Sequence, residues 1–149
     1  MISNSAEETR EIGEKIARSL KAGDVILLDG DLGAGKTELA RGIARGLGVK
    51  ETVTSPSFTI LNVYDSGMLP LYHFDWYRLE SEEELYELGL DEYLGGDGAA
   101  LVEWPARCPD AVPPVHLTIR LEPLDENRRR LRFQPAGGFR NLIPDDADE

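Results

Sequence analysis

The sequence predicts an α/β protein with a compact P-loop NTPase-like fold, in which a mainly parallel central sheet carries added antiparallel strands and flanking helices. An apolar run at 24–28 is followed by the Gly-rich segment 30–37 and by a helix-like stretch, 38–47, that ends at Gly48. This strand–loop–helix order is typical of the first unit of such folds. Two further apolar runs, 71–75 and 99–103, each end in an acid, as buried parallel strands of this fold class do.

The first half of the chain is predicted to form two helices and three strands. Residues 6–21 have apolar residues at helical spacing, and Ser5 with Glu8 forms a capping-box pattern at their start. After the strand at 24–28 and the helix at 38–47, we expect strands at 58–64 and 71–74, joined by a hairpin turn at 65–67.

The second half predicts a short helix at 81–88, with a second capping box at Ser81 and Glu84, and a buried strand at 99–102. The alternation over 115–121 predicts a half-buried strand whose inward residues are Val115, Leu117, Ile119 and Leu121. Residues 130–133 are expected to pair with it.

Composition indicates one domain spanning 1–149, of which about 135–149 forms a mobile acidic tail. The net charge of −12, from 16 basic and 28 acidic residues, argues against broad non-specific binding to nucleic acid. Cys108 is the only cysteine, which fits a reducing compartment. The sequence contains no membrane-spanning run and no apolar signal core, so we expect a cytoplasmic protein without membrane contact.

The segment 30–37, Gly-Asp-Leu-Gly-Ala-Gly-Lys-Thr, is a complete G-x-x-x-x-G-K-[ST] phosphate-binding loop. Its glycines allow the backbone amides to approach phosphate oxygens, and the following helix adds the positive end of its dipole. Lys36 supplies a mobile charge for the β- and γ-phosphates, and the Thr37 hydroxyl is placed to bind Mg²⁺. The loop therefore predicts binding of a nucleoside triphosphate with Mg²⁺, through Asp31, Leu32, Gly33, Ala34, Gly35, Lys36 and Thr37.

A magnesium–nucleotide site also needs a carboxylate opposite the loop, and two acids are candidates. Glu103 ends the apolar run Ala-Ala-Leu-Val, the position expected of a Walker-B-type acid, and Asp75 ends Leu-Tyr-His-Phe in the same way. The alternative for each is a solvated acid at a strand end. Spacing does not assign metal binding to one acid and positioning of water to the other.

Three other segments have both a functional and a structural interpretation. The hydroxyl-rich segment 52–59 lies where a switch-like loop would pass the γ-phosphate, or it is an ordinary polar loop. The aromatic residues near the two acids, including Trp104, either belong to the core or line the pocket or a partner face. The arginines within 128–132 protect a strand edge, or they contact RNA or an acidic partner.

Four motifs together resemble the bacterial TsaE (YjeE) family, in that family's order and with about its spacing. They are the loop at 30–37, Thr-Ser-Pro-Ser-Phe-Thr at 54–59, Tyr-His-Phe-Asp-Trp-Tyr-Arg-Leu at 72–79 and Leu-Val-Glu-Trp-Pro at 101–105. The resemblance covers residues 5 to about 105. Trp76 and Ser57 stand where many members have other residues.

The resemblance implies a function that the composition and spacing do not show. The family is the ATPase component of the machinery that makes N6-threonylcarbamoyladenosine beside the tRNA anticodon. It acts with the TsaB and TsaD proteins, reaches tRNA indirectly through that complex, and is thought to reset it between turnovers.

The resemblance also assigns residues. It implies that Lys36 and its loop bind the phosphates of ATP and that Thr37 and Glu103 hold Mg²⁺. It places Asp75, with Lys36 and Glu103, in catalysis. Trp104 belongs to the active region or to a partner contact, and Thr9 matches a position that contacts the nucleotide near the adenine.

Three rival functions remain open at this stage. A small-molecule kinase would need an acceptor pocket and usually a lid, and no Arg-rich insertion of that size is visible. A GTPase switch would need an Asn-Lys-x-Asp segment, which the sequence lacks. In a non-catalytic module, ATP would only lock an assembly interface.

Overall fold

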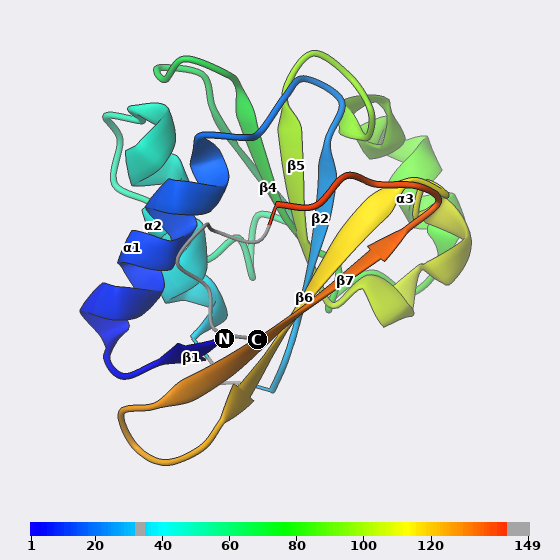
Figure 1. Cartoon of the computed structure of the whole chain (residues 1–149). Coiled ribbons are helices and arrows are strands. Elements are labelled where there is room, and N and C mark those ends of the chain that lie inside the picture. Colours follow the sequence, from blue (N-terminus) through cyan, green and yellow to red (C-terminus); the bar gives the residue numbers. More distant parts are fainter. Residues whose placement is uncertain (32–34, 143–149) are drawn as a thin grey trace.

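The computed structural model describes residues 1–31 and 35–142, which form a seven-stranded sheet with helices on both faces (Figure 1). In chain order the elements are β1 (Ile2–Ser3), α1 (Ala6–Ala17), β2 (Val25–Asp29), α2 (Lys36–Leu47), β3 (Leu61–Tyr64), β4 (Leu71–Asp75), α3 (Glu82–Glu87), η1 (Leu90–Tyr93), β5 (Ala99–Glu103), η2 (Pro105–Arg107), η3 (Pro109–Ala111), β6 (His116–Pro123) and β7 (Arg129–Ala136). The elements η1, η2 and η3 are single 3₁₀ turns.

The sheet is parallel in its centre and antiparallel at both sides, which confirms the predicted fold class. The strand order is β1-β7-β6-β2-β5-β4-β3. The pairs β6–β2, β2–β5 and β5–β4 are parallel, whereas β3, β7 and β1 pair antiparallel with their neighbours. The carboxyl ends of β2, β4 and β5 therefore meet at one edge, where ligands of open α/β sheets bind.

Each face of the sheet has its own apolar core. On one face α1 and α2 pack with Ile16, Leu39 and Ile43 against β2 and β5. On the other, Leu85 of α3 and Cys108 cover residues such as Phe74. Among the described residues, no helix is long and apolar enough to cross a membrane.

Helices α1 and α2 lie unusually close together because small residues face each other where they cross. A Cβ atom added to Gly42 would lie 2.1 Å from the carbonyl oxygen of Arg10, and one added to Gly13 would lie 2.6 Å from that of Leu39. Ion pairs also connect the two helices, including Arg45 to Glu14 at 2.6 Å. This contact fixes where the amino-terminal turn of α2 lies.

Several predicted boundaries differ from the structure. The first helix ends at Ala17 rather than residue 21. The strand expected from residue 58 begins only at Leu61, because Ile60 has a positive φ of 69° that interrupts the extended backbone. Val115 precedes β6 and is 49% exposed, so its expected inward position is wrong.

Two capping boxes were predicted, and only the serine of the first, Ser5, caps its helix in the structure. The Ser5 hydroxyl accepts a hydrogen bond from the amide of Glu8 at 3.0 Å. Ser81 makes no side-chain cap; the Glu84 carboxylate instead accepts from the amide of Glu80, outside the helix.

The carboxyl-terminal segment is packed further than expected. We expected a mobile tail from about residue 135, but β7 continues to Ala136, and Phe139 and Leu142 are buried in the core. Arg140 also forms an ion pair with Asp24 at 2.6 Å. The rest of the expected tail, 143–149, lies outside the described residues.

We predict that Gly42→Ala destabilises the protein by about 1–3 kcal/mol, because the new methyl group meets backbone atoms that cannot move aside. Helix propensity alone predicts the opposite sign, a gain of about 1 kcal/mol. Urea denaturation measures the difference. Glu11→Ala on the exposed side of α1 is the control and should change stability by less than about 0.5 kcal/mol. A more stable Gly42→Ala variant would contradict the close helix contact.

Candidate functional site

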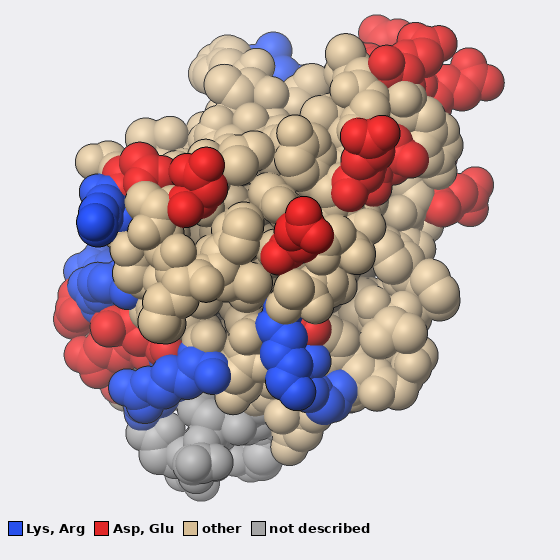
Figure 2. All heavy atoms as spheres, turned by 90° about the horizontal axis from the view of Figure 1, so that it is seen from above, with Lys and Arg blue, Asp and Glu red and all other residues tan. Residues whose placement is uncertain are grey.

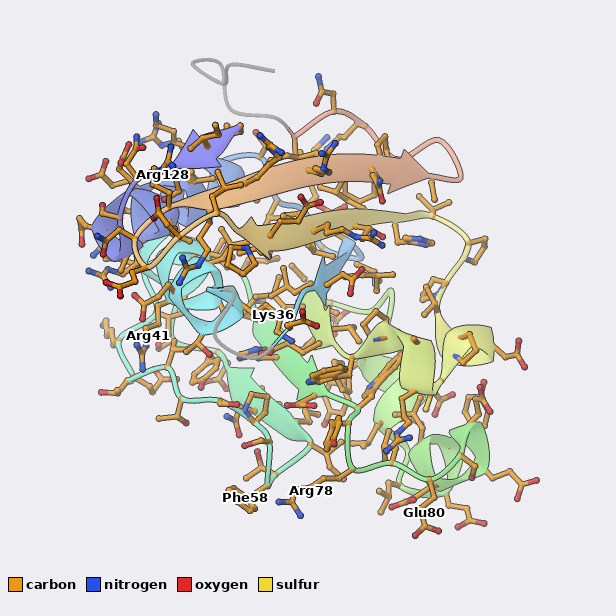
Figure 3. The ribbon with its side chains drawn as sticks, turned by 90° about the horizontal axis from the view of Figure 1, so that it is seen from below. Lys36, Arg41, Phe58, Arg78, Glu80 and Arg128 are labelled. Atoms are coloured by element: carbon orange, nitrogen blue, oxygen red, sulfur yellow. The ribbon has the colours of Figure 1, made fainter. Side chains whose placement is uncertain are left out.

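A cavity of about 340 Å³ opens at the carboxyl edge of the sheet, and Lys36, labelled in Figure 3, is one of the residues that line it. Segments far apart in the sequence contribute to its wall. The lining residues are Gly35, Lys36, Thr37, Glu38, Ser55, Ser57, Asp75, Glu103, Trp104 and Arg129. The cavity thus joins the phosphate-binding loop, the hydroxyl-rich loop and the ends of β4 and β5.

The start of α2 offers backbone amides to this cavity. Gly35 has a φ of 101°, a left-handed conformation that suits glycine, and α2 begins at the next residue. Because Gly35 has no side chain, it cannot cap the helix, and the first amides are available to an anion. Leu32, Gly33 and Ala34, also predicted to bind phosphate, lie outside the described residues.

Lys36 is buried against Glu103, the last residue of β5, and Trp104, which follows it. Its Nζ lies 3.9 Å from Oε1 of Glu103 and 4.3 Å from the centroid of the Trp104 ring. Trp104 reaches this position through a positive φ of 57° directly after the strand. The ring of Tyr77, in turn, lies 5.0 Å from that of Trp104. The ammonium therefore rests between a carboxylate and an aromatic face.

Asp75 and Glu103 are neighbours across two parallel strands. They are register partners at the ends of β4 and β5, and only 5% and 4% of their surfaces are exposed. Burial raises the pKa of Asp75, and the nearby Glu103 raises it further. A hydrogen bond of 2.9 Å, which the amide of Tyr77 donates to Oδ1 of Asp75, and the charge of Lys36 act in the opposite direction.

His73 contacts Glu103, although the sequence analysis gave it no role. Its Nε2 lies 2.7 Å from Oε2 of Glu103, and the imidazole is completely buried. The two residues belong to adjacent strands and lie on the same face of the sheet, since Leu101 is the register partner of His73. Strand order, which the sequence did not reveal, is needed to find this pair.

Two hydrogen bonds hold the amino-terminal end of the hydroxyl-rich loop, residues 52–59, beside the cavity. The carbonyl of Val53 accepts a hydrogen bond of 3.3 Å from Arg41 of α2. The amide of Thr54 donates to the Tyr64 hydroxyl at 3.2 Å. Ser55 and Ser57 line the cavity, and whether the segment acts as a switch-like loop or is an ordinary polar loop stays a prediction.

A second, smaller cavity of about 100 Å³ adjoins the first and contains Thr9. It shares Gly35, Glu38 and Arg129 with the larger cavity. The Thr9 hydroxyl lies 2.7 Å from that of Ser3, at the start of α1. Thr9 is thus placed near the loop but outside the larger cavity.

The positions of two further residues, Asp31 and Arg129, differ from those that the sequence predicts. Asp31, predicted to bind phosphate, is exposed and lines a separate depression beside Arg120. Arg129, which we grouped with a strand-edge cluster, borders both cavities, and its Nη1 donates to the carbonyl oxygens of Asp125 and Arg128 at 2.9 and 3.0 Å. It holds the β6–β7 turn next to the start of α2.

The oxygen donors of the larger cavity suit Mg²⁺ bound together with phosphates. Thr37, Asp75 and Glu103 line the cavity, and hard oxygen ligands are those that Mg²⁺ prefers. In the part of the chain that the structure describes, no three His, Cys, Asp or Glu residues form a metal-binding cluster. The set is thus too small for an all-protein cage, and it fits an ion that keeps water and phosphate ligands.

Asp75→Asn should stabilise the metal-free protein at pH 7.5. The raised pKa means that the folded state binds the proton more tightly than the unfolded chain, so folding loses stability as the pH rises and Asp75 ionises. Asparagine removes this charge and keeps the oxygen that accepts from Tyr77. The gain should shrink as the pH falls toward the pKa of the carboxyl group.

Thermal denaturation with EDTA at pH 7.5 and pH 5 measures this difference. Asp110→Asn, at an exposed position, is the control and should have little effect at either pH. A loss of stability in Asp75→Asn at pH 7.5 would show that the Asp75 carboxylate stabilises the fold.

Comparisons with known proteins agree on one family. Residues 3–131 match the family model described as "Threonylcarbamoyl adenosine biosynthesis protein TsaE". The TsaE protein of Bacillus subtilis is 46% identical over 92% of this chain and 85% of its own, and that of Treponema pallidum is 42% identical over 87% and 96%. The crystal structure of B. subtilis YdiB superposes with a TM-score of 0.80 at 40% identity, covering 92% of this chain and 84% of that one. The motifs, the fold and these matches together show that the chain belongs to the TsaE family.

Proposed function

We propose that this chain binds ATP with Mg²⁺ and hydrolyses it as an accessory protein in the N6-threonylcarbamoyladenosine modification of tRNA. It would act in the cytoplasm on a TsaB–TsaD complex and reach tRNA only through that complex. The observation that carries the proposal is the grouping of buried Lys36 with two buried carboxylates, Asp75 and Glu103, in one cavity at the start of a helix. Membership of a family named for this biosynthesis supports the pathway.

The two adjoining cavities offer separate places for the parts of ATP. The triphosphate fits the larger one, where the amides from Gly35 to Thr37 and the charge of Lys36 would bind its oxygens. The nucleoside would lie toward the smaller one, which Thr9 and Arg129 line. Asp31, Leu32, Gly33 and Ala34 would complete the loop around the phosphates.

The proposed reaction is an in-line attack of water on the γ-phosphorus, which breaks the bond to the β–γ bridging oxygen and releases ADP and phosphate. Asp75 would accept a hydrogen bond from the water, and its raised pKa suits a group that also takes up a proton. Lys36 and the loop amides would stabilise the charge that develops on the phosphate oxygens. Mg²⁺, held by Thr37 and Glu103, would add neutralising charge.

The arrangement around Lys36 supports slow turnover by the chain alone. Its ammonium already contacts Glu103 and Trp104, and it must leave them to reach a phosphate. The stack continues from Trp104 to Tyr77, and the guanidinium of Arg107 lies 5.4 Å from the Tyr77 ring. Because Tyr77 is 55% exposed, a partner that contacts it could change the position of Lys36.

The same contacts also favour a second candidate, a nucleotide-locked assembly module without hydrolysis. In that case ATP would displace Lys36 from Glu103 and hold the complex together. The two candidates differ in whether hydrolysis itself is needed for tRNA modification.

ATP hydrolysis by the purified chain should be slow and should rise when TsaB and TsaD are added. Lys36→Ala should lower the rate by about 10²- to 10³-fold, because the main cation at the phosphates is lost. Lys50→Ala, an exposed lysine at the end of the helix–loop unit, is the matched control and should retain the rate.

The same samples test the alternative when threonylcarbamoyladenosine is quantified in tRNA by mass spectrometry. Glu103→Gln should abolish both hydrolysis and modification. Equal rates with and without the partners would contradict partner activation, and modification that persists in Glu103→Gln would favour the assembly module.

ATP binding should also change the fluorescence of Trp104, because phosphates draw Lys36 away from its ring. The only other tryptophan, Trp76, is fully buried and gives a constant background. A Trp104→Phe variant should lose the response and keep ATP affinity within about tenfold, since a contact of this kind contributes at most about 1–2 kcal/mol. A response that survives in this variant would come from Trp76, and the absence of any response in the original chain would contradict the movement of Lys36 away from Trp104.

A further inference from the structure

His73 is a buried polar residue that the proposed reaction does not use. It lies in the middle of β4, two residues before Asp75, and its side chain is on the same face of the sheet as Glu103. It is completely inaccessible to solvent. A buried imidazole beside a candidate Mg²⁺ ligand needs a physical explanation.

The partners of the two ring nitrogens define how the imidazole is used. Nε2 lies 2.7 Å from Oε2 of Glu103, whereas Nδ1 has no hydrogen-bond partner among the described residues. An ionised carboxylate can only accept, so Nε2 carries a proton and donates it. A bare Nδ1 is tolerated better than a buried N–H without an acceptor, which favours the tautomer with its proton on Nε2.

This hydrogen bond leaves the two oxygens of Glu103 in different positions. Oε2 is engaged by His73, and Oε1 is the oxygen that lies 3.9 Å from Nζ of Lys36 at the cavity. A glutamate has three side-chain torsions, and a buried partner fixed on a central strand restricts them to one orientation.

We propose that His73 is a positioning residue that holds Oε2 of Glu103 and thereby directs Oε1 toward the Mg²⁺ of the bound nucleotide. This inference rests on the proposed function, because it assumes that Glu103 holds the ion. Loss of a group that hydrogen-bonds to a metal ligand commonly lowers metal affinity by about 10- to 100-fold. His73 acts only through Glu103, and it touches neither the nucleotide nor the reacting atoms.

Two substitutions separate the hydrogen bond from the packing of the ring. In His73→Gln, the amide nitrogen stands as many bonds from Cα as Nε2 does, so it can still donate to Glu103. His73→Met fills a similar space without a donor. The measurement is the affinity of the fluorescent nucleotide mant-ADP as Mg²⁺ is titrated, which does not depend on catalysis.

In His73→Met, the Mg²⁺ concentration that gives half of the effect on mant-ADP affinity should rise by about tenfold or more. The affinity without Mg²⁺ should stay unchanged, because the phosphate loop is intact. In His73→Gln, this Mg²⁺ concentration should lie within about threefold of that of the original chain. That difference is smaller than the change expected when such a partner is lost. In a Glu103→Ala background, His73→Met should have no further effect on Mg²⁺ dependence.

If His73→Met fails to fold, His73→Asn replaces it, since its shorter amide stands at the place of Nδ1 and does not reach Glu103. Unchanged Mg²⁺ dependence in the variant without a donor would overturn the proposal. So would an equal loss in His73→Gln, or an effect that persists in the Glu103→Ala background, because each indicates a purely structural histidine. If the original chain binds mant-ADP without any response to Mg²⁺, the proposed function fails together with this inference, and the variants are not needed to show it.

Discussion

The burial of one lysine between two strand ends is the constraint on which the carboxyl edge of the sheet depends. Asp75 and Glu103 are neighbours in the register, and both are almost inaccessible to solvent. Two buried carboxylates at this spacing repel each other and lose their hydration, so they need a cation or hydrogen-bond donors nearby. Lys36, His73 and the amide of Tyr77 supply these contacts. The stability of the two buried carboxylates therefore depends on all three of these partners.

The position of that lysine depends in turn on the packing of two helices. Gly13 and Gly42 let α1 and α2 approach until backbone meets backbone, and salt bridges such as Arg45–Glu14 lie across the contact. As a result, the first turn of α1, with Thr9, lies beside the first turn of α2. The smaller cavity exists because of this approach. A contact between helices thus determines the shape of a site at the end of the sheet.

The end of the molecule opposite the cavity carries charged side chains of both signs. Figure 2 views the structure from the end of the sheet opposite the cavity and shows the Lys and Arg side chains in small groups between acidic ones. A surface of this kind does not attract the phosphate backbone of a nucleic acid over a wide area. This agrees with the acidic net charge and with a chain that would reach tRNA only through partner proteins.

Local patterns predicted the fold and the loop because each of them is encoded in a few consecutive residues. The strand before Gly30, the helix after Gly35 and the acids at 75 and 103 could be identified in this way, and the sheet brings these acids together. The contacts of His73 and Arg129 could not be predicted, since they depend on which strands are neighbours and on where the β6–β7 turn lies. Phe139 and Leu142 stand singly in a segment rich in Gly, Pro and acids, so the pattern there indicated a tail although both residues pack into the core.

The charges of Asp75, Glu103 and Lys36 also explain why nucleotide and Mg²⁺ should bind to this site together. Without one, burial and Glu103 raise the pKa of Asp75, so its ionised form is unfavourable in the folded chain. The ammonium of Lys36 lies between the carboxylate of Glu103 and the ring of Trp104. A triphosphate alone would add negative charge beside two carboxylates, whereas Mg²⁺ brought with it offsets that charge. Nucleotide and ion should therefore bind together, and Glu103 can take part only if its free oxygen already faces the cavity, the orientation in which His73 holds it.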